Sequence, residues 1–393
     1  MTGTRFISSA PAARKRRLFS LSALLAVTLV ACRGAGDLPK PEIVAPGIRL
    51  YRLSDPSLID PAGPVAVQIL RLDPRRVTLK SALSDDYVVG TETVLDTFQR
   101  HKAIAAINAG FFLPNGDPNG LLQVDGELVS DTARPRGAIA VTIEDQVTRL
   151  LFDVVTAEAR VRFGNDDDAP SVEIAGIDTT RQRGRLMLFT PKYYAHTDTA
   201  ARGIEWVVGG SPLAVRERRD DLGSAPIPTE GFVLSYGGLD PPAELEAVKV
   251  GDPAKLERRF VTRHGTPPAR WAAADHVIGG AGLLAKNGQY ITDWAVEDLR
   301  GGFATDRHPR TMVGVDRDGD IWLVTVDGRN PQISLGMTFV ELQRLAARLK
   351  LTDVLNLDGG GSTTMVVKGA IVNHPSDTAG PRKVSDSLIV IGR

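Results

Sequence analysis

Twice along this chain, a helical pattern leads into an apolar run that ends in a polar residue and glycine. The first unit joins a helix expected at residues 93–101 to an apolar run at 103–107, which ends in Asn108-Ala109-Gly110. The second joins a helix expected at 338–349 to a strand that ends in Asn356-Leu357-Asp358-Gly359. Ligands of α/β folds usually bind near the C-terminal ends of strands, so both ends are candidate site positions.

The remainder of the chain has the pattern of short strands and turns. Its 39 glycines and 25 prolines favour many turns over a helical bundle. A content of 42% hydrophobic and 24% charged residues is typical of globular proteins and excludes wholesale disorder. We expect residues 63–393 to form one domain with an α/β (α+β-like) fold, in which helices flank a mixed β-sheet core and further β-rich segments are added.

The first 32 residues have the pattern of an export signal. A basic cluster precedes an apolar run at 18–30, which is too short to span a bilayer comfortably. The run ends in Leu29-Val30-Ala31-Cys32, which resembles a bacterial lipobox whose cysteine is acylated. We therefore expect a lipoprotein signal peptide at 1–31, lipidation of Cys32 and a tether at 32–62.

These features predict an exported protein that a lipid holds on the periplasmic or extracellular side of a membrane. An ordinary signal peptide with a chance cysteine is the alternative. Arg16-Arg17-Leu18-Phe19 also resembles a twin-arginine signal, so Sec export and folded export both stay open. Cys32 is the only cysteine, which excludes a disulfide framework and a cysteine-rich zinc site.

The charge balance argues against a nucleic-acid partner. The chain has 47 basic and 47 acidic residues, and the expected signal peptide carries five of the basic ones and none of the acidic ones. The mature chain is therefore mildly acidic, and it has no global basic field to hold a nucleic-acid backbone.

Asp358 is the strongest candidate for chemistry. Asn356 and Asp358 lie two positions apart on a strand and are expected to point to the same side. Gly359, Gly360 and Gly361 follow, and such a turn lets the backbone approach a ligand while its N–H groups converge on an anion. The structural alternative is a tight turn in which the aspartate caps its own backbone. The motif lacks the Gly-Lys-Ser/Thr of a P-loop and the Gly-x-Ser-x-Gly of a nucleophile elbow.

Two further positions offer a cation and a second carboxylate. Arg310 precedes a strand, and its planar guanidinium suits phosphate or carboxylate, although an arginine beside a proline is often a surface residue. Asp327 follows the apolar run 321–326 and is either a turn residue or a second active-site carboxylate.

Metal and covalent acyl chemistry receive little support from residue spacing. Asp316, Asp318 and Asp320 are typical of a hairpin turn, because the further ligands of a calcium loop are missing. The six histidines show no zinc-type pairing, and no Ser–His spacing indicates an acyl enzyme. No cofactor is required by these patterns, and a divalent cation near the acidic residues stays open.

Six motifs in a fixed order resemble the phosphodiester glycosidase family over roughly residues 65–393. They are Asn108-Ala109-Gly110-Phe111-Phe112, Ile278-Gly279-Gly280-Ala281-Gly282 before Asn287-Gly288, His308-Pro309-Arg310-Thr311, Val326-Asp327-Gly328-Arg329, Leu357-Asp358-Gly359-Gly360-Gly361-Ser362-Thr363-Thr364, and Val372-Asn373-His374-Pro375-Ser376-Asp377. Two stretches depart from the family pattern. Gly279-Gly280-Ala281-Gly282 stands where a Gly-Gly-Gly-Pro-like turn is expected, and Ser385-Asp386-Ser387-Leu388 stands where relatives tend to have an Asn or Ala.

The resemblance implies hydrolysis of a sugar-1-phosphodiester between the anomeric carbon and the phosphate oxygen. Phosphate leaves readily, so the site needs mainly a carboxylate near the oxocarbenium-like centre and a cradle for the phosphate. In this interpretation Asp358 and Asp327 are the catalytic carboxylates, and Arg310 with the amides of Gly359, Gly360 and Gly361 holds phosphate. The residues expected to bind sugar hydroxyls or to orient the carboxylates are Asn108, Ser362, Thr363 and Asp377.

The preferred hypothesis is a lipid-anchored hydrolase that acts on a carbohydrate phosphodiester of the cell envelope or an extracellular glycan. A non-catalytic glycan-binding lipoprotein with the same fold is the second hypothesis. A structural envelope protein without carbohydrate affinity is the third.

Overall fold

The computed structural model describes residues 38–166 and 169–393. The expected signal peptide and the lipidation site Cys32 lie outside these residues and stay predictions. Within the described part, strands far outnumber helices, and nearly all of the strand pairs are antiparallel. The helices are α1 (Val94–Arg100), α2 (Ala243–Glu246), α3 (Pro268–Ala272) and α4 (Phe339–Arg348), with 3-10 turns η1 (Pro56–Leu58), η2 (Ser84–Asp86), η3 (Ala295–Glu297) and η4 (Gly360–Ser362).

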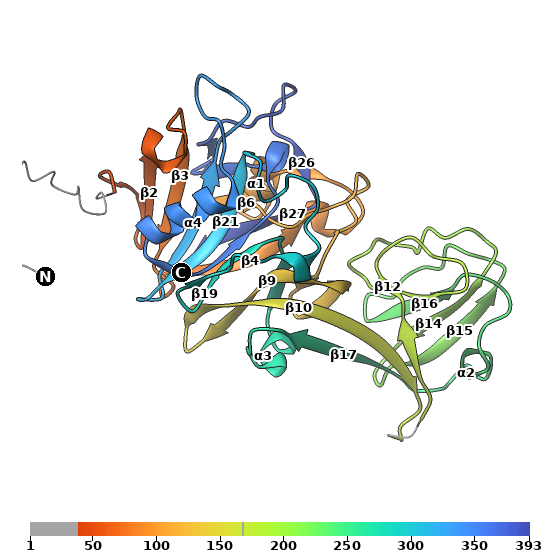
Figure 1. The fold of residues 1–393 in the computed structure, drawn as a ribbon. Helices are drawn as coiled ribbons and strands as arrows, with labels where there is room; N and C mark the ends of the chain where they lie inside the picture. The colour runs from red at the N-terminus through yellow and green to blue at the C-terminus, as the bar shows by residue number, and fades with distance from the viewer. Residues whose placement is uncertain (1–37, 167–168) are drawn as a thin grey trace, which may run out of the picture. The chain divides into compact units, whose positions relative to one another are not determined.

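An eight-stranded sheet joins the first strands of the described body to strands from its C-terminal third (Figure 1). In spatial order its strands are β1 (Glu42–Ala45), β2 (Ile48–Leu53), β3 (Val67–Leu72), β22 (Ile321–Val326), β21 (Arg310–Asp316), β23 (Leu351–Asn356), β19 (Leu283–Lys286) and β20 (Gln289–Tyr290). The central strand β22 is a continuous apolar run and is buried along its whole length, because both faces of the sheet are covered.

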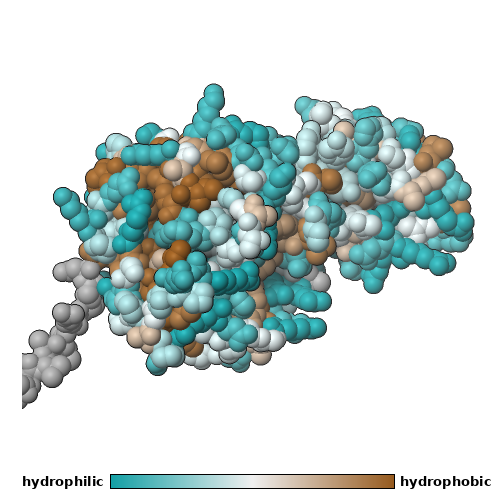
Figure 2. All heavy atoms as spheres, turned by 90° about the horizontal axis from the view of Figure 1, so that it is seen from above, coloured by the Kyte–Doolittle hydropathy of each residue, from teal (hydrophilic) through white to brown (hydrophobic). Residues whose placement is uncertain are grey.

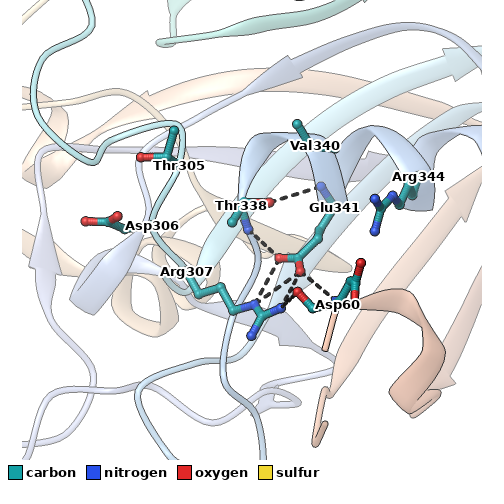
Figure 3. A pocket seen from close by; sticks show the side chains of 8 residues that line it. All are labelled: Asp60, Thr305, Asp306, Arg307, Thr338, Val340, Glu341 and Arg344. Atoms are coloured by element: carbon teal, nitrogen blue, oxygen red, sulfur yellow. Dashed lines mark hydrogen bonds and ion pairs between the residues drawn. The ribbon is translucent and has the colours of Figure 1, made fainter. Parts of the chain in front are cut away.

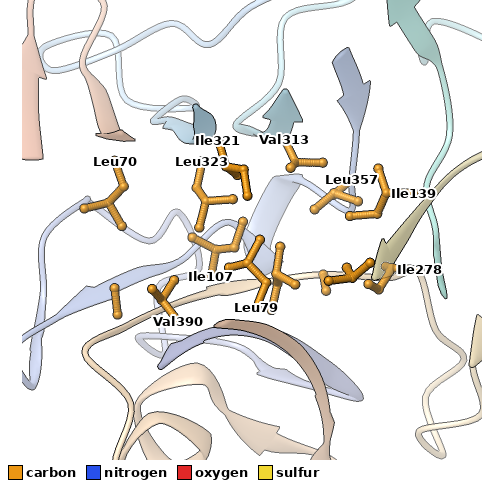
Figure 4. Packing of buried hydrophobic residues seen from close by; sticks show 14 of the residues in the cluster. Leu70, Leu79, Ile107, Ile139, Ile278, Val313, Ile321, Leu323, Leu357 and Val390 are labelled. Carbon is orange, nitrogen blue, oxygen red and sulfur yellow. The ribbon is translucent and has the colours of Figure 1, made fainter. Parts of the chain in front are cut away.

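A five-stranded sheet packs against the inner face of the first. It contains, in order, β25 (Ala370–Ile371), β24 (Met365–Val367), β6 (Ala105–Asn108), β27 (Asp386–Gly392) and β4 (Val77–Leu83). A two-stranded ladder joins β26 (Lys383–Val384) to β5 (Glu92–Thr93). Figure 4 shows the shared core, in which Leu323 and Val313 from one sheet meet Leu79, Ile107 and Val390 from the other.

A third sheet extends the same core and contains a very long strand, β10. Its strands are β11 (Ser171–Ile174), β10 (Val147–Phe163), β9 (Thr132–Glu144), β18 (His276–Gly279), β7 (Leu122–Val124) and β8 (Glu127–Ser130), with β17 (Ala254–Thr262) paired to β10. Ile139 and Ile278 contribute to the first core, whereas Val161 and Phe163, at the far end of β10, belong to a second one.

The second core lies under a smaller sheet near the far end of β10 (Figure 1). This sheet contains β12 (Gly176–Ile177), β13 (Leu186–Phe189), β16 (Gly231–Tyr236), β14 (Ile204–Gly209) and β15 (Ala214–Asp220). Its β12 and β13 are parallel. The large buried side chain of Trp206 anchors this core.

Helix α4 covers the outer face of the large sheet, as its sequence predicts. Thr338 accepts a hydrogen bond from the Glu341 amide, and the Glu341 carboxylate accepts one from the Thr338 amide, so the expected capping box is present. Phe339, Leu342 and Leu345 are fully buried against the sheet. The shorter α1 begins at the expected Thr93 cap and ends at Arg100.

Two parts of the structure differ from the sequence prediction. Residues 42–53, assigned to a tether, form β1 and β2, because Ile48, Leu50 and Leu53 supply buried side chains to the large sheet. The body therefore begins about twenty residues earlier than expected. The fold is also richer in strand than the α/β description implied: its four helices are short and two of them contain five residues or fewer within the described residues.

No helix among the described residues combines the length and the apolar character needed to cross a bilayer. Figure 2 shows one face of the molecule, on which hydrophobic patches are interrupted by hydrophilic side chains.

Candidate functional site

Asp327 and Asp358 emerge at the same edge of the large sheet. Strands β22 and β23 flank β21 and both end at this edge, where Val326 pairs with Arg310 and Asn356 pairs with Met312. Two strand spacings separate the two ends, so the backbones that carry the two aspartates are on the order of 10 Å apart. The predicted meeting of these two motifs at one strand end is therefore present.

Asn108 joins the two packed sheets at this edge. It is fully buried at the end of β6, and its Nδ2 donates to the Asp358 carbonyl at 2.7 Å. Its Oδ1 accepts from the Thr311 hydroxyl at 2.7 Å and from the Thr364 amide at 3.2 Å. The upstream asparagine thus reaches the predicted site, but it holds the protein backbone in place instead of contacting a sugar.

The three glycines after Asp358 allow close approach by the protein itself. A methyl group on Gly359 would lie 2.6 Å from the Pro309 carbonyl oxygen. One on Gly361 would lie 2.2 Å from both Arg382 Nη2 and Asp377 Oδ1. Gly360 has φ +58°, a left-handed conformation that favours glycine.

Several amides of this corner donate hydrogen bonds to other groups of the protein. The Gly359 amide donates to Asp358 Oδ1 at 2.8 Å, and the Gly360 amide donates to the Pro309 carbonyl at 2.9 Å. The amides of Ser362 and Thr363 donate to carbonyls within the same turn. The amides of Gly359 and Gly360 are therefore engaged within the protein, and phosphate binding by the glycine amides stays a prediction.

The Asp358 carboxyl group is set up to change protonation near neutral pH. Burial raises its pKa to about 6, although the Ser362 hydroxyl, the Gly359 amide and the charge of Arg382 each favour the ionised form. A carboxylate whose pKa is raised by desolvation and lowered by one nearby cation is a candidate for a functional site.

Asp386 is a second buried carboxyl group at this edge, and the sequence analysis did not select it. It begins β27, is 2% exposed, and accepts from the Gly110 amide at 3.0 Å. Burial raises its pKa to about 6, and the charge of Asp358 adds to the rise. The Asp386 Oδ2 atom has no hydrogen-bond partner among the described residues. Only its departure from the family pattern drew attention to this position.

The Asp327 carboxylate is hydrogen-bonded to both the backbone and the side chain of His374. It is 1% exposed, and its Oδ1 accepts from the His374 amide at 2.9 Å and from Asn373 Nδ2 at 3.1 Å. Its Oδ2 lies 3.0 Å from His374 Nδ1, while the imidazole side chain is 61% exposed. Asp327 is thus buried behind a histidine that faces solvent, an arrangement that fixes the imidazole with its Nε2 outward.

Arg310 does not face the site. Its Nε donates to the Met337 carbonyl at 2.9 Å, and its Nη2 donates to the carbonyls of Phe303 and Asp306 at 2.7 and 2.9 Å. The guanidinium is buried between the rings of Phe303 and Phe339, and burial lowers its pKa to about 10. The side chain that was predicted to bind phosphate is therefore directed into the protein, where it holds three backbone carbonyls in place.

Two other arginines surround the glycine corner. A methyl group on Gly360 would lie 3.0 Å from Arg329 Nη2, and Arg329 is exposed with no hydrogen bond to any described residue. Arg382 donates to the Asp377 carboxylate at 2.8 and 3.2 Å, so the predicted sugar ligand Asp377 orients an arginine instead. The sequence analysis did not select these two arginines, because the sequence pattern does not indicate which arginines lie close to the turn in the fold.

Several buried side-chain oxygens close to the three-glycine turn have no hydrogen-bond partner among the described residues. Among the described residues, the buried atoms Asn356 Oδ1, Thr363 Oγ1 and Thr364 Oγ1 accept or donate no hydrogen bond. Ser362 is fully buried, and its hydroxyl favours the charged form of Asp358. Unpaired buried polar atoms are uncommon in proteins and mark sites of function or strain.

A cavity of about 300 Å³ adjoins the same strand end. Phe111, Phe303 and Arg136 line it, together with Gly280 and Ala281. Ala281 exchanges two backbone and side-chain hydrogen bonds with Asn356, at 3.0 and 2.9 Å, which fixes this wall against β23. Arg136 is half-buried and has no hydrogen bond or ion pair within the described residues. Three arginines, Arg134, Arg136 and Arg300, line the cavity against one acidic residue, Asp298.

A second cavity lies beside α4, and an ion pair between Arg307 and Glu341 forms part of its wall (Figure 3). Arg307 donates to both oxygens of Glu341, which also accepts from the amides of Thr338 and Asp60. Burial alone would raise the pKa of Glu341, but these hydrogen bonds lower it to about 2. These hydrogen bonds stabilise the start of α4. Both oxygens of the Glu341 carboxylate are already hydrogen-bonded within the protein.

No group of three or more histidine, cysteine or acidic side chains is arranged to hold a metal ion in the part of the chain that the structure describes. Asp316, Asp318 and Asp320 lie in the predicted hairpin, where Asp316 accepts from backbone amides.

Residues 202–391 match the sequence model of the phosphodiester glycosidase family. The resemblance that the ordered motifs predicted is thereby confirmed over residues 202–391. Over 87 residues, the chain is 37% identical to the N-acetylglucosamine-1-phosphodiester alpha-N-acetylglucosaminidase of Bos taurus. The match covers 21% of this chain and 16% of that relative, so the chain corresponds to a small part of the curated relatives it matches.

Solved structures share the fold over most of the chain. A hypothetical protein from Synechocystis superposes with a TM-score of 0.74 at 22% identity, covering 91% of this chain and 64% of the other. A protein from Burkholderia pseudomallei superposes with a TM-score of 0.71 at 25% identity, covering 84% and 74%.

Proposed function

We propose that this protein hydrolyses glycosyl phosphodiesters at the edge formed by β22, β23 and β6. In the reaction, the bond between the anomeric carbon and the phosphate oxygen breaks. Water gives its hydroxyl group to the sugar and its proton to the released phosphate monoester. Family membership of residues 202–391 supports this reaction class, and the Asp358 carboxyl group, with a pKa of about 6 beside the unpaired oxygens of the glycine corner, is the observation that carries it.

Asp358 is the carboxylate that faces the anomeric carbon in this proposal. Above a pH of about 6 it is ionised, so it can stabilise positive charge at an oxocarbenium-like centre or attack that centre directly. The hydrogen bond from Asn108 to the Asp358 carbonyl fixes the backbone from which this carboxylate projects.

Arg329 and Arg382 are the proposed phosphate ligands. Both come within close contact of the glycines that follow Asp358, and Arg382 already acts on the Asp358 charge. Guanidinium groups at this position would offset the charge that develops on the departing phosphate. The nearby cavity that holds Arg136 gives room for the rest of the substrate.

His374 is the proposed proton-transfer group, and Asp327 is its positioning residue. The hydrogen bond between Asp327 and His374 Nδ1 leaves Nε2 to exchange a proton with the attacking water. This division of roles replaces the prediction that Asp327 contacts substrate, because Asp327 is buried behind the imidazole.

The reaction is tested by hydrolysing α-N-acetylglucosamine-1-(methyl phosphate) in water enriched in ¹⁸O. Cleavage at the anomeric carbon places the label in the sugar and none in methyl phosphate. Label in the phosphate product identifies a phosphodiesterase that attacks phosphorus and contradicts the proposal. Binding of the substrate without turnover supports the non-catalytic alternative.

We also propose that the domain acts outside the cytoplasm on a cell-envelope or extracellular glycan, held by a lipid on Cys32. The N-terminal basic and apolar pattern with its terminal cysteine supports this location. Cell fractionation of the full chain and of a Cys32→Ser variant tests it. Release of the variant from the membrane fraction is expected, and equal membrane retention contradicts the anchor.

A further inference from the structure

The structure contains a larger cavity away from Asp358 that the proposed reaction does not use. It has a volume of about 760 Å³ and lies between the segments that follow β4 and β6 on one side and the loops of the smaller sheet on the other. Residues from both sides line it, including Val89 and Asn115 from one and Arg183 and Arg202 from the other.

The floor of this cavity is built from buried, hydrogen-bonded groups. Glu205 is fully buried and accepts from the hydroxyls of Thr197, Thr199 and Ser235 at 2.8, 2.9 and 3.1 Å. Arg181 donates to the Ser235 hydroxyl and to the Arg202 carbonyl at 3.2 and 2.9 Å. These bonds hold the 197–202 loop in a fixed form, so the cavity is preorganised.

The cations at its mouth are free to bind a ligand. Arg183 and Arg202 are exposed and have no side-chain hydrogen bond or ion pair to any described residue. Asp198 is the one acidic residue among those that line the cavity, against three arginines. The cavity therefore favours an anionic ligand.

Aromatic side chains beside the cavity suit a carbohydrate. The rings of Tyr87 and Tyr194 meet edge to face at 5.4 Å and are 37% and 48% exposed. Tyr193 lines the cavity, and its ring packs on Phe189 at 4.8 Å. Exposed tyrosines present an apolar face and a hydroxyl group together, as the surface of a sugar requires.

One loop links this cavity to the candidate active site. The Ser84 amide donates to the Ser385 carbonyl, next to Asp386, and five residues later Val89 donates to the Tyr193 carbonyl at the cavity. Even a fully extended chain spans no more than about 17 Å over five residues. Figure 1 shows this loop, in orange, beside the green loops of the smaller sheet.

We propose that the cavity binds a further anionic unit of a polymeric substrate, one or more repeats away from the bond that Asp358 cleaves. This inference rests on the proposed function and specifies its substrate as a chain of phosphodiester-linked sugars. Arg183 and Arg202 bind a phosphate of the next repeat, and the tyrosines contact the sugar between. The interaction lowers KM for the polymer and leaves kcat unchanged, because it is equally strong before and during bond cleavage.

The test compares two probes, α-N-acetylglucosamine-1-(methyl phosphate) and a tetramer of N-acetylglucosamine-1-phosphate units. The parent protein is expected to show a kcat/KM at least tenfold higher for the tetramer. In Arg183→Ala/Arg202→Ala this preference is expected to disappear through a rise in KM, while kcat/KM for the small probe stays unchanged. Arg185→Ala is the matched control, since Arg185 is exposed on the same loop but does not line the cavity.

The outcomes separate the cavity from the reaction. Hydrolysis of both probes with no tetramer preference, or a preference that survives the double substitution, overturns the cavity proposal and leaves the proposed function standing. If the parent hydrolyses neither probe, the proposed function fails. Calorimetric binding of the tetramer then decides the cavity proposal: binding that the double substitution weakens at least tenfold supports it, and binding that is absent or unchanged overturns it.

Discussion

Asp358 and Asp386 are hydrogen-bonded through their backbones to the same residue, Ala109. The Asp358 amide donates to the Ala109 carbonyl at 3.0 Å, and the Ala109 amide donates to the Asp386 carbonyl at 3.3 Å. This places the half-buried carboxyl group of Asp358 and the buried one of Asp386 at one sheet edge, and the charge of Asp358 contributes to the raised pKa of Asp386. Like charges in a dry site resist ionising together, so one of the pair tends to keep its proton.

Asp386→Asn should make the stability of the protein less dependent on pH. The folded-state pKa of about 6 exceeds the ordinary value of 3.8, so the folded protein holds this proton more tightly than the unfolded chain. The resulting stabilisation is complete below a pH of about 4 and is lost as the pH rises through about 6. We expect the variant to gain about 1 to 3 kcal/mol at pH 8 and nearly nothing at pH 4, measured by urea unfolding at both values. Equal effects at the two pH values would show that Asp386 is ionised in the folded protein throughout.

Arg310→Ala should damage folding and not phosphate binding directly. The change leaves three backbone carbonyls without their donor and opens space between two phenyl rings. We expect a loss of about 3 kcal/mol in the free energy of unfolding. Unchanged stability with a selective loss of affinity for phosphate would restore the sequence-based interpretation of this residue.

Arg329→Ala should lower activity and leave the free energy of unfolding nearly unchanged. Its exposed guanidinium has no partner within the described residues, so stability should change by less than about 0.5 kcal/mol. We expect kcat/KM for the small phosphodiester to fall about 10- to 100-fold, which is the typical effect of losing one charge-assisted contact. Arg317→Ala, an exposed arginine in the hairpin at the other end of β21, is the control and should match the parent.

Substitutions of Asp327 and His374 should have non-additive effects on kcat, because both residues act through the same imidazole. His374→Gln is expected to lower kcat by about 100-fold, the usual contribution of a general acid or base. Asp327→Asn should lower it comparably, and should add little in the His374→Gln background. Additive effects in this double-mutant cycle would show that Asp327 acts on the substrate by itself.

Local sequence signals were sufficient for the elements that position the site. The Thr338–Glu341 capping box depends on two side chains and their neighbouring amides, so its outcome could be predicted from four residues. Strands ending at Asn108 and Asn356 followed from apolar runs that stop at polar residues. Their meeting was predicted from the order of motifs, and the hydrogen bond from Asn108 to the Asp358 carbonyl bears it out.

Side-chain direction could not be predicted in the same way. Arg310 resembles a surface ligand in the sequence, but the aromatic side chains that enclose it come from Phe303 and Phe339, on separate segments. Asp386 was missed because it opens a strand about thirty residues beyond Asp358, and only the packing of β27 beside β6 brings the two together. The early strands β1 and β2 were taken for a tether because each is too short for its alternation to stand out.

The most direct test of this account compares hydrolysis of α-N-acetylglucosamine-1-(methyl phosphate) by Asp358→Asn and by Asp353→Asn. Asp353 lies on β23, the strand that leads to Asp358, where it pairs with Lys286 at 3.0 Å, and serves as the matched control. The account predicts that Asp358→Asn stays folded and loses kcat/KM by about 1,000-fold or more, while Asp353→Asn retains activity within a few-fold of the parent. A folded Asp358→Asn protein that hydrolyses the substrate as fast as the parent would contradict it.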